Sequence, residues 1–315
     1  MKPKMLSIIL LSYYSKERIR KSYLAIKQLL ESENIQFEFI VMDDGSKDES
    51  FIMALELEKK YENVRAYQLS KNYGSMYSIF AGLSVSKGAC VLPIVDDEQQ
   101  PYPTIVQMYR LWEKGEKIII PNRESRDDSK MSKFMSDTFY KVMNGISDIE
   151  YPKGGADMAF LDREVVDIIN SRIHPRNTMF MAEVLNLGFS PYFLPYERPI
   201  GLNKGKSRWT FKKKMRAALD SIFSNSTFPL RLISYLGLII SILSFIAIIF
   251  YLYVAIWGNK DFWGVTVPGW TSIILLMFLL GGLVLLCLGV ISEYLWRIYD
   301  EVKDRPGYII KKNIV

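Results

Sequence analysis

Residues 90–103 read CVLPIVDDEQQPYP, and this stretch indicates the fold class and the position of a site. Its apolar run, residues 91–95, has the length of a strand buried on both faces of a parallel sheet. The run ends in Asp96, Asp97 and Glu98. Buried carboxylates are costly without a positive partner, and ligands of open α/β sheets bind at this edge. A site for Mg²⁺ or Mn²⁺ is therefore predicted, the alternative being an ordinary polar exit from a strand.

Short apolar runs alternate with segments of helical periodicity over residues 5–120. Strands are expected at residues 6–11, 37–42, 64–69, 91–95 and 117–121, with helices between them. A further strand is expected at residues 158–161, after a glycine turn. This alternation predicts an α/β domain with βαβ units and a mostly parallel sheet, whose right-handed crossovers bring the strand ends to one edge.

Polar residues directly follow three of the expected strands. They are Ser12 and Tyr13, Asp43 and Asp44, and Asp96 and Asp97. One Asp-Asp-Gly-Ser sequence is weak evidence, because Asp-Gly also forms ordinary turns. Two Asp-Asp pairs at the ends of sheet strands are more specific. Together these side chains are suited to a nucleotide pocket, which needs acceptors for hydroxyl groups and a metal site for the diphosphate.

Two late segments, residues 232–257 and 270–291, are almost free of polar residues. Each exceeds the roughly 20 apolar residues needed to cross a bilayer, so two transmembrane helices are expected. Basic residues gather before the first segment and after the second, which predicts a multi-pass inner-membrane protein with both termini in the cytoplasm. The short loop 258–269 would then face outward.

The net charge is +6, and part of it lies in residues 204–216, which hold seven basic residues and no acidic one. Because the first apolar segment follows closely, an amphipathic stretch on an anionic membrane face is favoured over a solvated charged helix. Anionic lipid and phosphorylated substrates account for the charge, and no nucleic-acid partner is expected. The predicted domains are a catalytic domain (1–203), a juxtamembrane segment (204–231), the two membrane helices (232–292) and a cytoplasmic tail (293–315).

Several short motifs, spread over nearly the whole chain, now point to one family. They are DDGSKD at 43–48, KNYG at 71–74, DEQQP at 97–101, NRESR at 122–126, Asp157 after a glycine pair, STFPLR at 226–231, EYLWRIY at 293–299 and Arg305-Pro306. In these motifs the chain resembles glycosyltransferase family 2. It is most similar to the membrane-bound polyprenyl-phosphate members, such as bactoprenol glucosyltransferases and relatives of dolichol-phosphate mannose synthase.

The resemblance implies a GT-A-type, Rossmann-like fold and transfer of a sugar from a nucleotide-sugar donor to a polyprenyl phosphate acceptor. Gln99 and Pro101 set the register of the metal motif, which places Val95 at its first acidic position and Asp97 at its last. Asp97, with Asp96, is thus the expected metal ligand. The other implied roles are catalytic for Asp97 and Asp157; nucleotide-binding for Ser12, Tyr13, Asp43, Asp44, Lys71 and Asp96; and acceptor-phosphate-binding for Arg123, Arg126, Lys133 and Ser136.

Two other functions stay open at this point. One is a family 2 transferase with a different acceptor, although the Gln-x-x-Arg-Trp motif of processive members is not matched by GKSRW at 205–209. The other is a non-catalytic membrane scaffold that keeps a nucleotide-binding fold, which Val95 in an acidic position makes conceivable. A homo-oligomer is compatible with each of these functions.

Overall fold

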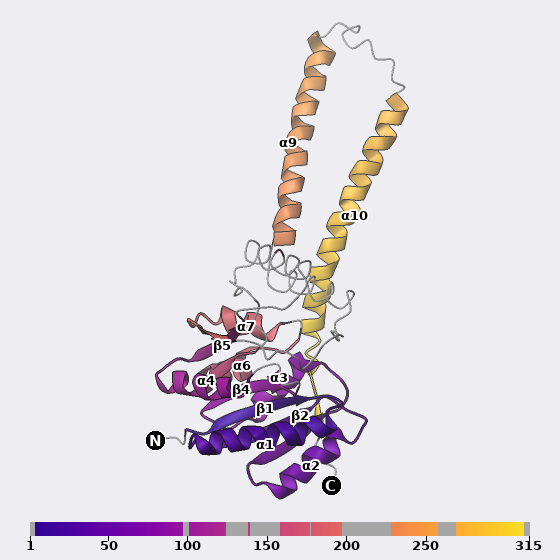
Figure 1. The fold of residues 1–315 in the computed structure, drawn as a ribbon. Helices are drawn as coiled ribbons and strands as arrows, with labels where there is room; N and C mark the ends of the chain where they lie inside the picture. Colours follow the sequence, from indigo (N-terminus) through magenta and orange to yellow (C-terminus); the bar gives the residue numbers. More distant parts are fainter. Residues whose placement is uncertain are drawn as a thin grey trace. The chain divides into compact units, whose positions relative to one another are not determined.

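The computed structural model describes residues 4–96, 101–123, 138, 158–176, 178–196, 228–257 and 269–311. The chain divides into two compact units. One comprises Met1–Ser224 together with Arg305–Val315, and the other comprises Asn225–Asp304. The first unit is an α/β domain and the second is helical (Figure 1).

The α/β unit is built on an eight-stranded sheet with the order β7-β5-β6-β4-β1-β2-β3-β8 among the described residues. Its elements are β1 (Leu6–Ser12), α1 (Lys16–Ser32), β2 (Phe37–Asp43), α2 (Ser50–Lys60), β3 (Val64–Leu69), α3 (Ser75–Val85), β4 (Cys90–Val95), α4 (Pro103–Glu113), β5 (Ile118–Arg123), β6 (Phe160–Asp162), α6 (Arg163–Arg172), α7 (Phe180–Asn186), β7 (Tyr192–Tyr196) and β8 (Ile310–Lys311). β4, β1, β2 and β3 pair in parallel, as the alternating pattern predicts.

Both faces of the sheet are covered, which explains why its central strands are mostly apolar. Successive side chains of a strand point to opposite faces. In β1, Ile8 and Leu10 pack with residues of α1, α2 and α4, whereas Ile9 and Leu11 pack with residues of α3, α6 and α7. All the residues of β1 are buried. Two hydrophobic cores therefore hold the strands in place and fix where their carboxyl ends lie.

The sheet is mixed rather than parallel throughout. β6 lies between β4 and β5 and is antiparallel to both, so the fourth and fifth predicted strands are not neighbours. β5 consequently runs in the same direction as β4. The sequence patterns did not indicate β7, three of whose five residues are exposed, or the two-residue β8, which is antiparallel to β3.

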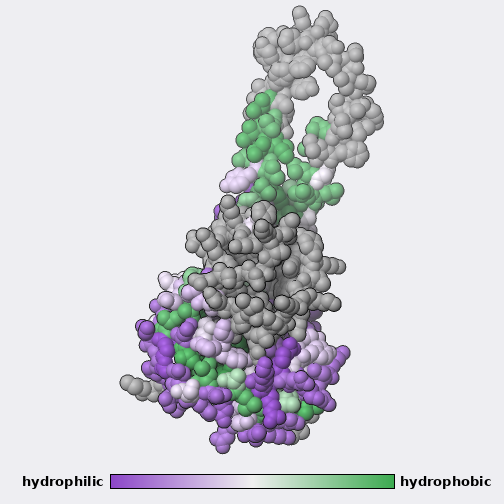
Figure 2. Space-filling model, viewed as in Figure 1, coloured by the Kyte–Doolittle hydropathy of each residue, from purple (hydrophilic) through white to green (hydrophobic). Residues whose placement is uncertain are grey.

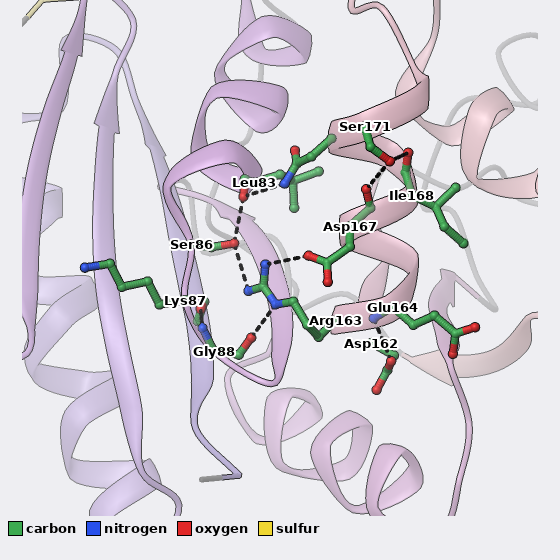
Figure 3. Close-up of polar contacts among 12 residues, drawn as sticks. Leu83, Ser86, Lys87, Gly88, Asp162, Arg163, Glu164, Asp167, Ile168 and Ser171 are labelled. Carbon is green, nitrogen blue, oxygen red and sulfur yellow. Dashed lines mark hydrogen bonds and ion pairs between the residues drawn. The ribbon is translucent and has the colours of Figure 1, made fainter. Parts of the chain in front are cut away.

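Arg163, at the start of α6, binds the loop that leads into β4 (Figure 3). Its Nε donates to the carbonyl oxygen of Gly88 at 2.7 Å, and its guanidinium also donates to Ser86 Oγ at 3.1 Å. Ser86 Oγ in turn donates to the carbonyl oxygen of Leu83 at 2.8 Å. Asp167, one turn along α6, lies 3.6 Å from the guanidinium. These contacts join α3, α6 and β4 at the amino end of β4, away from the polar residues at its carboxyl end.

Arg163→Ala is expected to lower the free energy of unfolding by about 2–3 kcal/mol, because hydrogen bonds from a charged, mostly buried donor are lost. The affinity for the nucleotide-sugar donor should stay unchanged, since these contacts lie at the amino ends of the strands and the predicted nucleotide-binding residues lie at the carboxyl ends. Asp167→Ala is the matched control: its side chain is 65% exposed, and an exposed ion pair contributes about 0–1 kcal/mol. Chemical denaturation measures both variants. Equal losses would show that the ion pair, not the two hydrogen bonds, stabilises this junction.

The helical unit holds two long helices, α9 (Phe228–Trp257) and α10 (Gly269–Val302). They cover the two apolar segments of the sequence, and α10 continues beyond the predicted end of its segment. Among the described residues, Leu280–Val302 is the one stretch long and apolar enough to span a membrane, and Phe228–Ile240 is a shorter apolar stretch. Where Figure 2 colours the two helices, exposed hydrophobic side chains prevail, whereas hydrophilic residues prevail on the visible face of the α/β unit. The second span stays a prediction.

Candidate active site

Polar residues gather where the central strands end. Ser12 and Asp43 are the last residues of β1 and β2, and they are register partners. Leu11 pairs with Val95, so Asp96 follows at the same level. Asn122 and Arg123 end β5, which runs in the direction of β4. The structure thus brings Ser12, Asp43 and Asp96, one residue from each predicted polar cluster, to one edge of the sheet, here called the carboxyl rim.

Asp43 holds the loop that follows β2. Its carboxylate accepts hydrogen bonds from the backbone N–H and the hydroxyl of Ser46, at 2.9 and 2.5 Å, and from Gln68 Nε2 at 2.9 Å. The side chain is fully buried. Because a buried group cannot reach a ligand without a rearrangement, this geometry favours an indirect role for Asp43, namely shaping the loop.

Asp44, in the DDGSKD motif, forms hydrogen bonds with the KNYG motif; the family resemblance implies nucleotide binding for residues of both motifs. Its two carboxylate oxygens accept the backbone N–H groups of Tyr73, at 2.7 Å, and Gly74, at 2.8 Å, just before α3. Burial raises the pKa of Asp44 above its usual value, although the two N–H donors oppose that shift. Gly45 has a φ of +69°, and a Cβ there would lie 2.5 Å from the carbonyl carbon of Lys71. We call residues 70–74 the donor loop.

Asp96 is the described carboxylate of the predicted metal motif. It is 7% exposed, accepts a hydrogen bond from Ser15 Oγ, and lies 3.1 Å from the guanidinium of Arg18 through the same oxygen, Oδ2. Arg18 thereby supplies the positive charge that a buried carboxylate requires. A divalent ion at Asp96 would share the carboxylate with Arg18 or displace it. The donor chemistry fits a hard cation, since carboxylate oxygens are the ligands such ions prefer.

Three further predicted nucleotide-binding residues lie on or near the rim. Ser12 is 2% exposed, and its buried Oγ has no hydrogen-bond partner among the described residues, so a ligand could bond to it only after a local rearrangement. Tyr13 is exposed next to Tyr14, whose φ is +52°; their rings make an edge contact at 4.5 Å between centroids. Lys71 is exposed, with its Nζ 4.9 Å from the centroid of the Tyr73 ring.

Several predicted residues lie outside the described part of the chain. They are Asp97, Asp157, Arg126, Lys133 and Ser136, and of Arg123 only the backbone is described. Within the described ranges, no group of three or more His, Cys, Asp or Glu side chains is arranged to hold a metal ion. The metal, catalytic and acceptor roles of these residues therefore stay predictions.

The sequence reasoning missed residues that support the site. Gln68 Nε2 donates hydrogen bonds to the carboxylate of Asp43 at 2.9 Å and to the carbonyl oxygen of Ser46 at 3.3 Å. Ser15 donates a hydrogen bond to Asp96, and Arg18 forms an ion pair with it. A signal was present for Arg18, a basic residue in the first turn of the helix that follows the first strand. Gln68 lies in an expected strand, where a single polar residue gives no comparable signal.

Comparison with known proteins identifies the family of this chain. The family model for glycosyl transferase family 2 matches residues 7–185. An uncharacterized glycosyltransferase from Synechocystis is 33% identical over 97% of this chain and 94% of its own length. A prophage-derived bactoprenol glucosyl transferase from Shigella flexneri is also 33% identical, over 98% of each chain.

A solved glucosyl-3-phosphoglycerate synthase from Mycobacterium tuberculosis, in complex with Mn²⁺, UDP and phosphoglyceric acid, is more distant. It is 14% identical over 70% of this chain and 77% of its own, with a TM-score of 0.46. The family model and the relatives that match nearly the full chain show the family. The chain belongs to glycosyl transferase family 2.

Proposed function

We propose that this protein transfers a sugar from a nucleotide-sugar donor to a polyprenyl phosphate, of the undecaprenyl type, at the cytoplasmic face of the inner membrane. The product would be a lipid-linked monosaccharide for cell-envelope glycans or glycosylation. One observation carries the proposal. The relatives named bactoprenol glucosyl transferase match 97–98% of this chain, so the likeness includes the two long helices as well as the catalytic domain.

The donor would bind at the carboxyl rim. The exposed ring of Tyr13 is open to a nucleotide, and Asp43 and Asp44 hold the loops beside it. The buried, unpartnered hydroxyl of Ser12 would reach the nucleotide after a local rearrangement. Asp97 and Asp96 would hold Mg²⁺ or Mn²⁺ next to the diphosphate. Such an ion, when bound, neutralises negative charge that develops on the leaving nucleoside diphosphate.

The acceptor needs little activation, because a phosphate monoester is already ionised at neutral pH. Its oxygen attacks the anomeric carbon as the bond to the nucleoside diphosphate breaks. Asp157 would orient the sugar or stabilise the positive charge that develops on it. The residues that would hold the acceptor phosphate by charge-assisted hydrogen bonds are Arg123, Arg126 and Lys133, with Ser136.

A lipid acceptor explains why the chain has two long apolar helices and a basic segment next to them. A polyprenyl tail stays in the bilayer while its phosphate lies at the surface, so the enzyme must work there. We propose that α9 and α10 both span the membrane, that residues 204–216 lie on its anionic face, and that both termini are cytoplasmic. The lysine and arginine asymmetry and the apolar length of Leu280–Val302 support this topology.

A transfer assay tests the proposal. The purified full-length protein in lipid nanodiscs is given a panel of radiolabelled nucleotide sugars with Mg²⁺ or Mn²⁺, and with undecaprenyl phosphate, a soluble sugar phosphate or no acceptor. We expect label in the organic phase for one donor, only with the lipid and only with metal. Label in a soluble product would indicate the different-acceptor alternative, and no product from any donor would support the scaffold.

Substitutions of Asp157 and of the basic residues should change different kinetic constants. Asp157→Asn is expected to lower kcat while donor affinity changes little, since its contact with the sugar strengthens in the transition state. Arg126→Gln and Lys133→Gln should raise the KM for the lipid and leave donor affinity alone. Lys130→Gln, in the same basic stretch but outside the proposed set, is the control. Loss of donor binding in the Arg126 variant would indicate that Arg126 binds the nucleotide rather than the acceptor phosphate.

A further inference from the structure

The chain leaves the α/β unit for the two long helices and then returns to it. Arg305–Val315 belongs to the same unit as β1 to β7, whereas α9 and α10 belong to the other. The returning segment forms β8 against β3, with Leu69 opposite Ile310 and Gln68 opposite Lys311. The backbone N–H of Ser70 donates to the carbonyl oxygen of Ile309 at 2.8 Å. β8 thereby covers the carboxyl end of the edge that β3 would otherwise expose.

Side chains reinforce this pairing. Tyr308 and Ile310 pack against the core beneath α3, α6 and α7, and the Tyr308 hydroxyl lies 3.5 Å from the carbonyl oxygen of Phe80. A Cβ at Gly307 would lie 2.8 Å from Pro175 Cγ and 3.2 Å from the ring of Tyr77. The segment before β8 is thus fitted closely against α3 and the loop after α6. Ile309 differs from these residues, because its side chain is 50% exposed.

The returning segment contacts Gln68, which holds Asp43, and Ser70, which lies close to the residues that hold Asp44. Gln68, paired with Lys311, donates to Asp43. Ser70, bound to Ile309, begins the donor loop, and its hydroxyl lies 3.0 Å from the hydroxyl of Tyr73. The N–H of Tyr73 donates to Asp44. A continuous set of hydrogen bonds therefore runs from the returning tail through β3 and the donor loop to Asp44.

We infer that residues 305–311, the docking tail, are a positioning element for donor binding: they fix the end of β3 and, through it, the donor loop. The inference deepens the proposed function, because it names what the donor loop depends on. Residues within the tail touch no reacting atom and act through Gln68 and Ser70. Nucleotide affinity would then depend on a segment far from the rim in sequence, placed after the apolar helices.

Neighbouring isoleucines provide a matched test. Ile310→Ser removes a side chain from the core, whereas Ile309→Ser changes an exposed one and keeps the carbonyl that binds Ser70. Hydrogen exchange, read by mass spectrometry on the full-length protein, should show faster exchange at residues 68–74 in Ile310→Ser, with β1 and β4 unchanged. The donor KM and the dissociation constant for the nucleoside diphosphate should rise about tenfold, within the usual range of coupling between sites, with kcat retained.

Ile309→Ser should behave as wild type in each measurement. The inference is overturned if Ile310→Ser frees the tail while residues 70–74 stay protected and the donor KM stays normal. It is also overturned if exchange accelerates throughout the sheet, since the tail would then only stabilise the fold. If Ile310→Ser does not fold, the milder Ile310→Val is judged by the same readouts. The exchange measurement needs no nucleotide, so absence of nucleotide binding in wild type would count against the proposed function alone.

Discussion

Asp97→Ala is expected to lower the rate of sugar transfer by about 100-fold or more, the usual cost of losing a group that stabilises transition-state charge. Asp97 follows the buried Asp96 at the exit of β4, where the sequence places two adjacent carboxylates. The Oδ2 of Asp96 is engaged by Arg18 and Ser15, which leaves Asp97 as the stronger candidate for the metal. Folding and membrane insertion should be unaffected.

Transfer rates and Mn²⁺ binding by paramagnetic resonance measure this variant. Glu98→Gln is the control, because it removes the next carboxylate, which the register of Gln99 and Pro101 places outside the metal motif. We expect near-normal transfer and Mn²⁺ binding in the control and loss of both in Asp97→Ala. Metal-dependent turnover near the wild-type rate in Asp97→Ala would show that the ligand assignment is wrong.

Asp44→Ala is expected to abolish donor binding and to lower the free energy of unfolding by about 2–3 kcal/mol. The change leaves the N–H groups of Tyr73 and Gly74 without an acceptor, and an unsatisfied buried donor costs about 1–3 kcal/mol. Removal of a buried charge, whose burial raises the pKa of Asp44, offsets part of this loss. Nucleotide titration calorimetry and thermal unfolding measure the two effects.

Asp48→Ala is the matched control in the same loop. Its exposed carboxylate accepts one hydrogen bond, from the N–H of Ser50 at 3.1 Å, so the loss should be at most about 1 kcal/mol with donor affinity retained. Normal nucleotide affinity in Asp44→Ala would contradict the view that the contact of Asp44 with the donor loop shapes the pocket.

The central fold was predictable because its strands are buried on both faces. Residues such as Ile8 and Ile9 in β1 serve two different cores, so the strand is a continuous apolar run that stands out from the helices around it. The position of β6 between β4 and β5 was not predictable, because pairing between distant strands leaves no local pattern. β8 has two residues, too few for any periodicity.

The carboxyl rim was predictable for a similar reason, since Asp43 and Asp96 each end an apolar run that is easily recognised. The contacts that these side chains make were not predictable. Ser15 and Asp96 are 81 residues apart, and the hydrogen bond between them depends on the pairing of β1 with β4. The sequence therefore predicted where the polar residues gather, whereas the indirect role that the geometry favours for Asp43 became visible only from its burial and hydrogen bonds.

The most direct test of the central claim is the mass of the lipid product. Wild-type protein in nanodiscs is incubated with undecaprenyl phosphate, metal and the donor that the panel selects, and the organic phase is analysed by mass spectrometry. The proposed reaction predicts a species equal to the acceptor plus one sugar residue, formed in equal amount to the nucleoside diphosphate released. Release of the nucleoside diphosphate with the lipid unchanged in mass would contradict it.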